Sequence, residues 1–149
     1  MQVQAEAELT REDRVAVERA VAQFNRGLFF ECHEILEDVW NRVRGPSRDF
    51  LQGLIQVSVG FHHLERGNRV GALRTFAKAQ ARLGAYPARY LGFDVAGERV
   101  RLEDLRKTLE AAKSAALDAA PTWCFEDLPL TEGTGDDWVE VTAQEDPRD

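Results

Sequence analysis

Residues 24–40 read FNRGLFFECHEILEDVW, and this stretch decides the fold. Gly27 follows a helical pattern, and glycine is the usual residue where a helix ends in a left-handed turn. Beyond it, apolar residues recur every three or four positions, which is the period of an amphipathic α-helix: Cys32, Ile35, Leu36, Val39 and Val43. The stretch therefore predicts a helical hairpin, in which one helix ends near residue 26 and the next covers about residues 29–44.

Similar signals predict further helices on both sides. Thr10 and Asp13 form a capping box with aspartate in the glutamate position, so the first helix is expected to begin there. Gly45-Pro46 ends the second helix, and Ser47 is placed to cap the third. In chain order, the expected helices cover about residues 10–26, 29–44, 48–65, 70–83 and 100–117.

The segment between the last two helices, residues 85–97, contains one proline and two glycines and is predicted to be a connector. The predicted fold is all-α: a compact bundle of about five helices, made of two antiparallel helical hairpins plus one helix. Its expected organisation is a flexible N-terminal lead (1–9), a helical domain (10–120) and an irregular acidic C-terminal tail (121–149).

A faint internal repeat with an offset of 40 residues favours the paired hairpins. Arg26-Gly27 matches Arg66-Gly67. Apolar positions also match, namely Cys32, Leu36, Val39 and Val43 with Ala72, Phe76, Ala79 and Leu83, and Val17 and Val21 with Val57 and Phe61. True identities are few, so the amphipathic period that all the helices share explains much of this match.

Composition and charge exclude several classes of function. The chain has 149 residues, 44% hydrophobic and 30% charged, and no apolar run approaches the ~20 residues that span a bilayer. Two cysteines make no disulfide framework, so a cytoplasmic protein without a membrane partner is expected. The formal net charge of -7 belongs to residues 121–149, which hold nine acidic residues and one basic residue. The nearly neutral body disfavours nucleic acid, and a protein partner or a homo-oligomer remains.

Chemistry-bearing side chains gather on the second and third expected helices. His33, Glu37 and Trp40 lie on adjacent turns at one border of the apolar stripe, and Glu34 belongs to an acidic group at the other border. A second polar stripe runs along the third helix. The candidate cluster is His33, Glu34, Glu37, Trp40, Arg48, Gln52, Gln56, His62 and His63.

One hypothesis for this cluster is metal chemistry. A histidine and a carboxylate one turn apart can share a metal ion, although the string here is HExxE, so the HExxH zinc motif is absent. Helical bundles complete such sites from neighbouring helices. In a metal-dependent hydrolase, His33, Glu37 and His63 would bind a divalent metal and Glu34 would act as general base. No cofactor is otherwise expected.

The alternative for the same residues is structural. Polar side chains at the edge of a core are usually hydrogen-bonded parts of the fold. Glu34 or Glu37 can pair with Arg48 across the Gly45-Pro46 turn and hold two helices in register. Under this hypothesis, Glu37→Ala leaves a buried arginine unpaired and costs about 3–5 kcal/mol of stability.

These motifs resemble a known family. The string at 24–40, RDFLQGLIQ at 48–56, Arg66-Gly67-Asn68, and Tyr86-Pro87 followed by Gly92-Phe93-Asp94-Val95 are similar to the signature of domain-of-unknown-function family 309, over about residues 20–110. The resemblance implies a small, helical, cytoplasmic protein of bacteria and archaea with no established activity. It marks signature positions and assigns none a role: His33, Glu34, Glu37, Trp40, Arg48, Gln52 and Gln56.

The sequence thus leaves three functions open. A small helical binding or scaffolding protein is expected first, because the faint repeat of helical hairpins favours it and the spacing of Ala72, Phe76 and Ala79 is similar to that of tetratricopeptide-type hairpins. A metal-dependent hydrolase and a purely structural cluster are the alternatives. Whether the protein is an enzyme does not follow from the sequence, and neither do its substrate, partner and oligomeric state.

Overall fold

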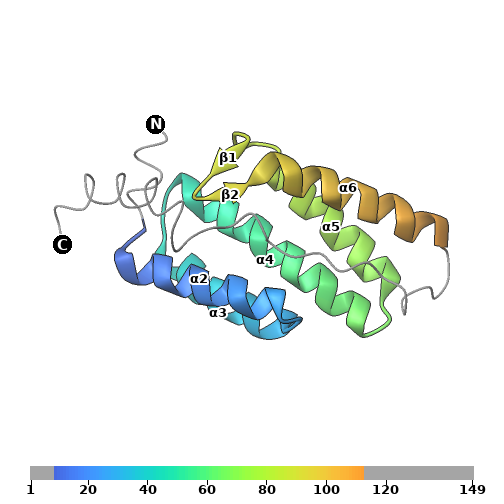
Figure 1. Ribbon diagram of the computed structural model, residues 1–149, viewed down its shortest axis with the longest axis horizontal. Coiled ribbons are helices and arrows are strands. Elements are labelled where there is room, and N and C mark those ends of the chain that lie inside the picture. The colour runs from blue at the N-terminus through green and yellow to red at the C-terminus, as the bar shows by residue number, and fades with distance from the viewer. Residues whose placement is uncertain (1–8, 113–149) are drawn as a thin grey trace.

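The computed structural model describes residues 9–112, so the expectations for residues 1–8 and for the acidic tail (121–149) lie outside the described residues. The described chain forms α2 (Arg11–Asn25), α3 (Phe29–Arg42), α4 (Pro46–Glu65), α5 (Arg69–Leu83), β1 (Arg89–Tyr90), β2 (Phe93–Asp94) and α6 (Val95–Ala112). In Figure 1, α2 and α3 lie along one side of α4, and α5 and α6 lie along the other. The predicted all-α bundle of two hairpins and one further helix is confirmed.

The two hairpins contain the same turn. Arg26 and Arg66 have nearly identical backbone angles at the ends of α2 and α4 (φ -95°, ψ 4° and φ -92°, ψ 8°). The glycines that follow have φ of +83° and +76°, a region that glycine enters without a steric cost. In both turns the amide two residues after the cap donates back to the carbonyl three residues before it, which closes a Schellman motif.

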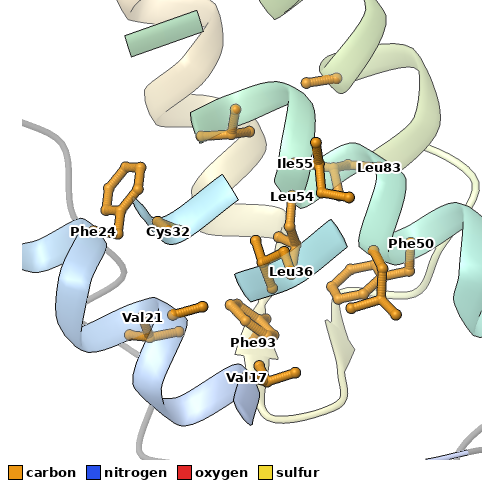
Figure 2. Packing of buried hydrophobic residues seen from close by; sticks show 14 of the residues in the cluster. Val17, Val21, Phe24, Cys32, Leu36, Phe50, Leu54, Ile55, Leu83 and Phe93 are labelled. Atoms are coloured by element: carbon orange, nitrogen blue, oxygen red, sulfur yellow. The ribbon is translucent and has the colours of Figure 1, made fainter. Parts of the chain in front are cut away.

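The core joins all the helices described. Figure 2 shows side chains from α2, α3, α4 and the β-hairpin pointing into a common interior. At one end Phe61 of α4 lies at the centre of an aromatic group, with its ring centroid 5.5 Å from Phe24, 5.2 Å from Phe29 and 5.2 Å from Phe76. Edge-to-face and stacked rings at these distances contribute beyond their buried area, so Phe61 ties the two hairpins together.

The capping box predicted at the start of α2 is confirmed. The Asp13 amide donates to Thr10 Oγ1 at 3.0 Å, and the Thr10 amide donates to Asp13 Oδ2 at 3.2 Å. The other oxygen of this buried carboxylate accepts from Arg42 Nη2 at 2.6 Å, near the end of α3. One aspartate therefore caps α2 and fixes the antiparallel register of α2 and α3.

The N-cap expected at Ser47 is wrong. Gly45 is the N-cap of α4, and Pro46 is its first residue, because proline has the right φ for a first helical turn and lacks an N–H that would need a partner there. Ser47 is fully buried instead, and its Oγ lies 2.8 Å from Tyr90 Oη. This hydrogen bond holds β1 against the start of α4.

The connector expected over residues 85–97 ends earlier than predicted. Residues 89–94 form a short antiparallel hairpin, in which Arg89 pairs with Asp94 and Tyr90 with Phe93. The Gly97 amide donates to Asp94 Oδ1 at 3.1 Å, so α6 begins at Val95 rather than near residue 100. An aspartate that accepts from the amide three residues ahead is a helix start signal that the proline and glycine content obscured.

Candidate functional site

The packing of α3 positions the polar cluster. Cys32, Leu36 and Val39 are buried at helical spacing, so the border toward α4 presents His33 and Trp40 half-buried. The Cys32 sulfur lies 3.1 Å from Ser58 Oγ, which shows that this border meets the middle of α4. Burial raises the pKa of the Cys32 thiol to about 12, against a smaller lowering by the Ser58 hydrogen bond. Cys32 is therefore an inert packing residue and not a nucleophile.

Trp40 and Arg48 form the best-defined contact of the cluster. The guanidinium carbon of Arg48 lies 3.7 Å from the Trp40 ring centroid, and Arg48 Nε donates to the Trp40 carbonyl oxygen at 3.1 Å. Arg48 thus bridges α3 and α4 through a cation–π contact. The ion pair expected between Arg48 and Glu34 or Glu37 is not among the contacts of the described residues, because the ring and the carbonyl take up the guanidinium.

His33, His62 and Phe30 form a second contact between the same helices. His33 Nδ1 lies 2.9 Å from the Phe30 carbonyl oxygen and donates to it, which leaves Nε2 toward Glu37 Oε1 at 3.9 Å. The Phe30 ring lies 5.0 Å from the His33 ring and 5.3 Å from the His62 ring. Phe30 was not among the expected site residues, although its place one turn before His33 on the exposed side of the apolar stripe was a usable signal.

His62, rather than His63, faces α3. His63 Nδ1 lies 3.3 Å from Asn68 Nδ2, in the turn between α4 and α5. Burial first, and then the positive neighbours His62 and Arg66, lower the pKa of His63 below its ordinary value of 6.5. His63 is therefore held neutral near the second hairpin turn, away from the contact of Phe30 with His33 and His62.

Gln52 and Gln56 lie on the outward side of α4. Together with Val59 and His63 they form a half-buried stripe with spacings of four, three and four. Gln56 Oε1 is enclosed and has no hydrogen-bond partner in residues 9–112. This outer stripe of α4 (Gln52, Gln56, Val59 and His63) is neutral and lies between α3 and α5.

The proposed metal ligands do not converge. Within residues 9–112, no three His, Cys, Asp or Glu side chains are grouped so that they could hold a metal ion. His33 is bonded to the Phe30 carbonyl, and His63 lies at the turn near Asn68. Glu34, the candidate general base, is exposed on the outside of α3. This arrangement offers neither a closed ligand set nor a base held against one.

A largely open surface depression of about 410 Å³ lies elsewhere, along α6 and beside Gln80 of α5. Its edge is tied by Gln80 Nε2, which donates to Glu103 Oε1 at 3.0 Å, and by Arg106 Nη1, which donates to Gln80 Oε1 at 3.2 Å. None of the residues expected in the polar cluster lines it. Its walls are Gln80, Ala96, Arg99, Val100, Glu103 and Asp104.

The fold and the polar cluster define the class of protein. It is a domain of helical hairpins in which polar residues join α3 to α4 and an acidic face of α3 is exposed. Residues 17–75 match the family model of the domain of unknown function DUF309. This match confirms the resemblance to that family that was drawn from the motifs. No described helix is both long and apolar enough to cross a membrane.

Two curated relatives are similar to parts of this chain. An uncharacterized protein of Aquifex aeolicus (strain VF5) is 28% identical over 109 residues, which make up 72% of this chain and 31% of that protein. The uncharacterized protein YpuF of Bacillus subtilis (strain 168) is 40% identical over 52 residues, which make up 34% of this chain and 30% of YpuF. The chain thus spans less than a third of the length of either relative.

Proposed function

We propose that the chain is a non-catalytic helical binding module, and that its recognition surface is the outward side of α3. This α3 face consists of Phe30, Glu31, Glu34, Glu37 and Asp38, all exposed. The single observation that carries the proposal is this pairing of an exposed aromatic ring, 45% accessible in Phe30, with four exposed carboxylates on one short helix. An aromatic anchor beside unpaired charge is the composition of a recognition surface.

The rest of the cluster supports binding over chemistry. Arg48 is engaged by Trp40, and His33 by the Phe30 carbonyl, so these groups position α3 rather than await a substrate. Glu37 is 52% exposed, and its nearest ion partner, His33 Nε2, is 3.9 Å away. The cluster is thus a scaffold that holds the α3 face in place.

The chemistry of the α3 face defines its partner. Four carboxylates favour lysine or arginine side chains, and the Phe30 ring favours an apolar side chain among them. A helix with basic residues beside one apolar position meets both requirements. The partner we propose is therefore a basic, partly apolar protein helix.

A peptide of known chemistry tests this. An 18-residue lysine–leucine amphipathic helix is titrated into the full chain by isothermal calorimetry, beside a glutamate–leucine peptide of the same pattern. The test variant is Glu31→Gln/Glu34→Gln/Asp38→Asn, and the matched control, Glu12→Gln/Asp104→Asn/Glu110→Gln, neutralises three exposed acids on α2 and α6. The test variant is expected to bind the lysine–leucine peptide about tenfold or more weakly than the unaltered chain does. The control variant is expected to bind it less than about twofold more weakly.

Equal losses in both variants would show that only net charge attracts the peptide, and the proposal would fail. Phe30→Ser separates the apolar part. It is expected to weaken binding at low and at high salt alike. The acid-to-amide changes are expected to weaken binding only at low salt, because high salt screens exposed charges. Binding of the glutamate–leucine peptide with equal strength would also contradict the proposal.

A further inference from the structure

α3 and α5 occupy equivalent places in the two hairpins, yet their outward positions carry opposite charges. With the offset of 40 residues, Glu34 corresponds to Arg74 and Asp38 to Lys78. All four side chains are exposed. An exposed apolar residue stands at the same place on both helices: Phe30 is 45% accessible, and its counterpart Val70 is 57% accessible.

The charges on the two helices are one-sided. α3 carries four acidic residues and one arginine, Arg42, whose charge is taken up by Asp13. α5 carries four basic residues and no acidic one: Arg69, Arg74, Lys78 and Arg82. Arg82 pairs with Asp49, and Arg69 donates to the Leu109 carbonyl. No ion pair in the described chain involves Glu34, Asp38, Arg74 or Lys78, so charge of both signs is left for a partner.

α3 and α5 lie along opposite edges of α4. The Cys32–Ser58 and Trp40–Arg48 contacts set α3 antiparallel to α4 along one edge. Along the other edge, a Cβ at Gly60 would meet Phe76 and one at Gly53 would meet Leu83, so α5 is antiparallel to α4 as well. α3 and α5 therefore run parallel to each other. The neutral outer stripe of α4 lies between them.

The geometry points to a second copy of this chain as the occupant of this face, and this inference rests on the proposed function, for which it names the partner. α5 has the chemistry that the α3 face requires: a basic helix with an exposed apolar side chain. A two-fold axis parallel to the helices places α3 of each copy against α5 of the other and closes the assembly. An axis across the helices would set acid on acid and base on base, so charge selects the first arrangement.

Charge reversal in the full chain tests the dimer. Sedimentation velocity and light scattering of the unaltered protein are expected to give twice the mass of one chain at low salt, with dissociation at high salt. Glu34→Lys/Asp38→Lys places basic side chains at these outward positions of both helices, and Arg74→Glu/Lys78→Glu places acidic side chains at them. Each variant is expected to raise the dimer dissociation constant by about 100-fold or more, because like charges then face each other.

An equimolar mixture of the two variants restores complementarity across both contacts, so a heterodimer with the affinity of the unaltered chain is expected. Circular dichroism of each variant checks the fold, and Asp104→Lys/Glu110→Lys on α6 is the matched reversal that should leave the dimer intact. A dimer that survives both α3 and α5 reversals, or variants that do not recombine, would overturn the inference.

A protein that stays monomeric at every concentration measured at low salt would also overturn the inference of a dimer. In that case, retained binding of the lysine–leucine peptide to the α3 face would leave the proposed function standing with a different partner. If the protein is monomeric and also fails to bind the lysine–leucine peptide, the proposed function fails as well. The two failures are therefore distinguishable.

Discussion

The hairpin α2–α3 and the hairpin α4–α5 share their turn and their buried positions, but they fill those positions differently. Cys32, Leu36 and Val39 of α3 correspond to Ala72, Phe76 and Ala79 of α5, and all six are buried. On the preceding helix, Ala20 of α2 corresponds to Gly60 of α4. The first hairpin thus has alanine and leucine where the second has glycine and phenylalanine.

This difference shows how a repeated backbone conserves volume rather than residue type. A Cβ at Gly60 would lie 2.3 Å from Phe76 Cε1, so α4 can approach α5 only without a side chain there. The larger ring and the missing methyl group compensate each other, as close packing requires. The helix propensity that Gly60 costs, about 1 kcal/mol, is offset by the contact of Phe76 with α4 and with Phe61.

The largest expected effect breaks this compensation. Gly60→Ala should lower the free energy of unfolding by up to about 3 kcal/mol, because the new methyl group overlaps the Phe76 ring. Phe76→Leu in the same chain should recover part of that loss, since it installs the pair found in the first hairpin. Urea unfolding of both single variants and the double variant measures the coupling. Additive losses would show that the two positions are independent.

The next effect separates two aspartate–arginine pairs, each of which links an early residue of one helix to a late residue of the next. Asp13 is buried, caps α2 and accepts from Arg42, whereas the Asp49 side chain that pairs with Arg82 is 67% exposed. Asp13→Ala should cost about 2 kcal/mol, since it removes both a cap and a charge-assisted hydrogen bond.

Asp49→Ala is the matched control and should cost less than about 1 kcal/mol, as exposed ion pairs do. Thermal or urea unfolding of the two variants compares them directly. Equal losses would mean that burial of Asp13 adds nothing.

The helices were predictable because each carries its own signal. The Thr10–Asp13 box and the two Arg-Gly turns are local, and the structure follows them closely. Ser47 and the 89–94 hairpin were missed because their conformation depends on a distant partner: Ser47 turns inward to meet Tyr90, 43 residues away. Local preference is overridden wherever such tertiary contacts are available.

Helical spacing predicted which residues of the polar cluster lie near one another on α3, but not the contacts that they make. Helical spacing placed His33, Glu37 and Trp40 at one border of α3, which the structure shows. It did not reveal that Arg48 contacts the Trp40 ring and carbonyl oxygen rather than a carboxylate, because this contact depends on how closely α3 and α4 pack. The rotation of α4, which turns His62 and not His63 toward α3, is likewise a property of the packed pair.

A smaller effect tests that Trp40–Arg48 contact against the carboxylate beside it. Arg48→Ala should cost about 1–2 kcal/mol, the sum of a half-exposed cation–π contact and one hydrogen bond. Glu37→Ala should cost less than about 0.5 kcal/mol, because Glu37 is half exposed and Arg48 does not depend on it. A loss of 3–5 kcal/mol for Glu37→Ala, about the value for an unpaired buried arginine, would return the cluster to the ion-pair arrangement expected from sequence.

The smallest expected effect concerns the second hairpin turn, where His63 replaces Gln23 of the first. The pKa of His63 is lower in the folded chain than its ordinary value of 6.5, mainly through burial. The unfolded chain therefore binds the proton first as the pH falls. The stability that neutral His63 contributes is complete above about pH 6.5 and is lost as the pH drops toward the lowered value.

His63→Gln installs the residue of the first hairpin and removes this titration. The free energy of unfolding of the variant should decline less than that of the unaltered chain between about pH 7 and about pH 5. The two proteins compared at about pH 8 provide the control, because His63 is neutral there in both states of the chain. The expected difference is small, since the ring is only partly buried. A steeper decline in the variant would mean that protonated His63 stabilises this turn, and the two hairpin turns would then differ in their electrostatics as well as in their sequence.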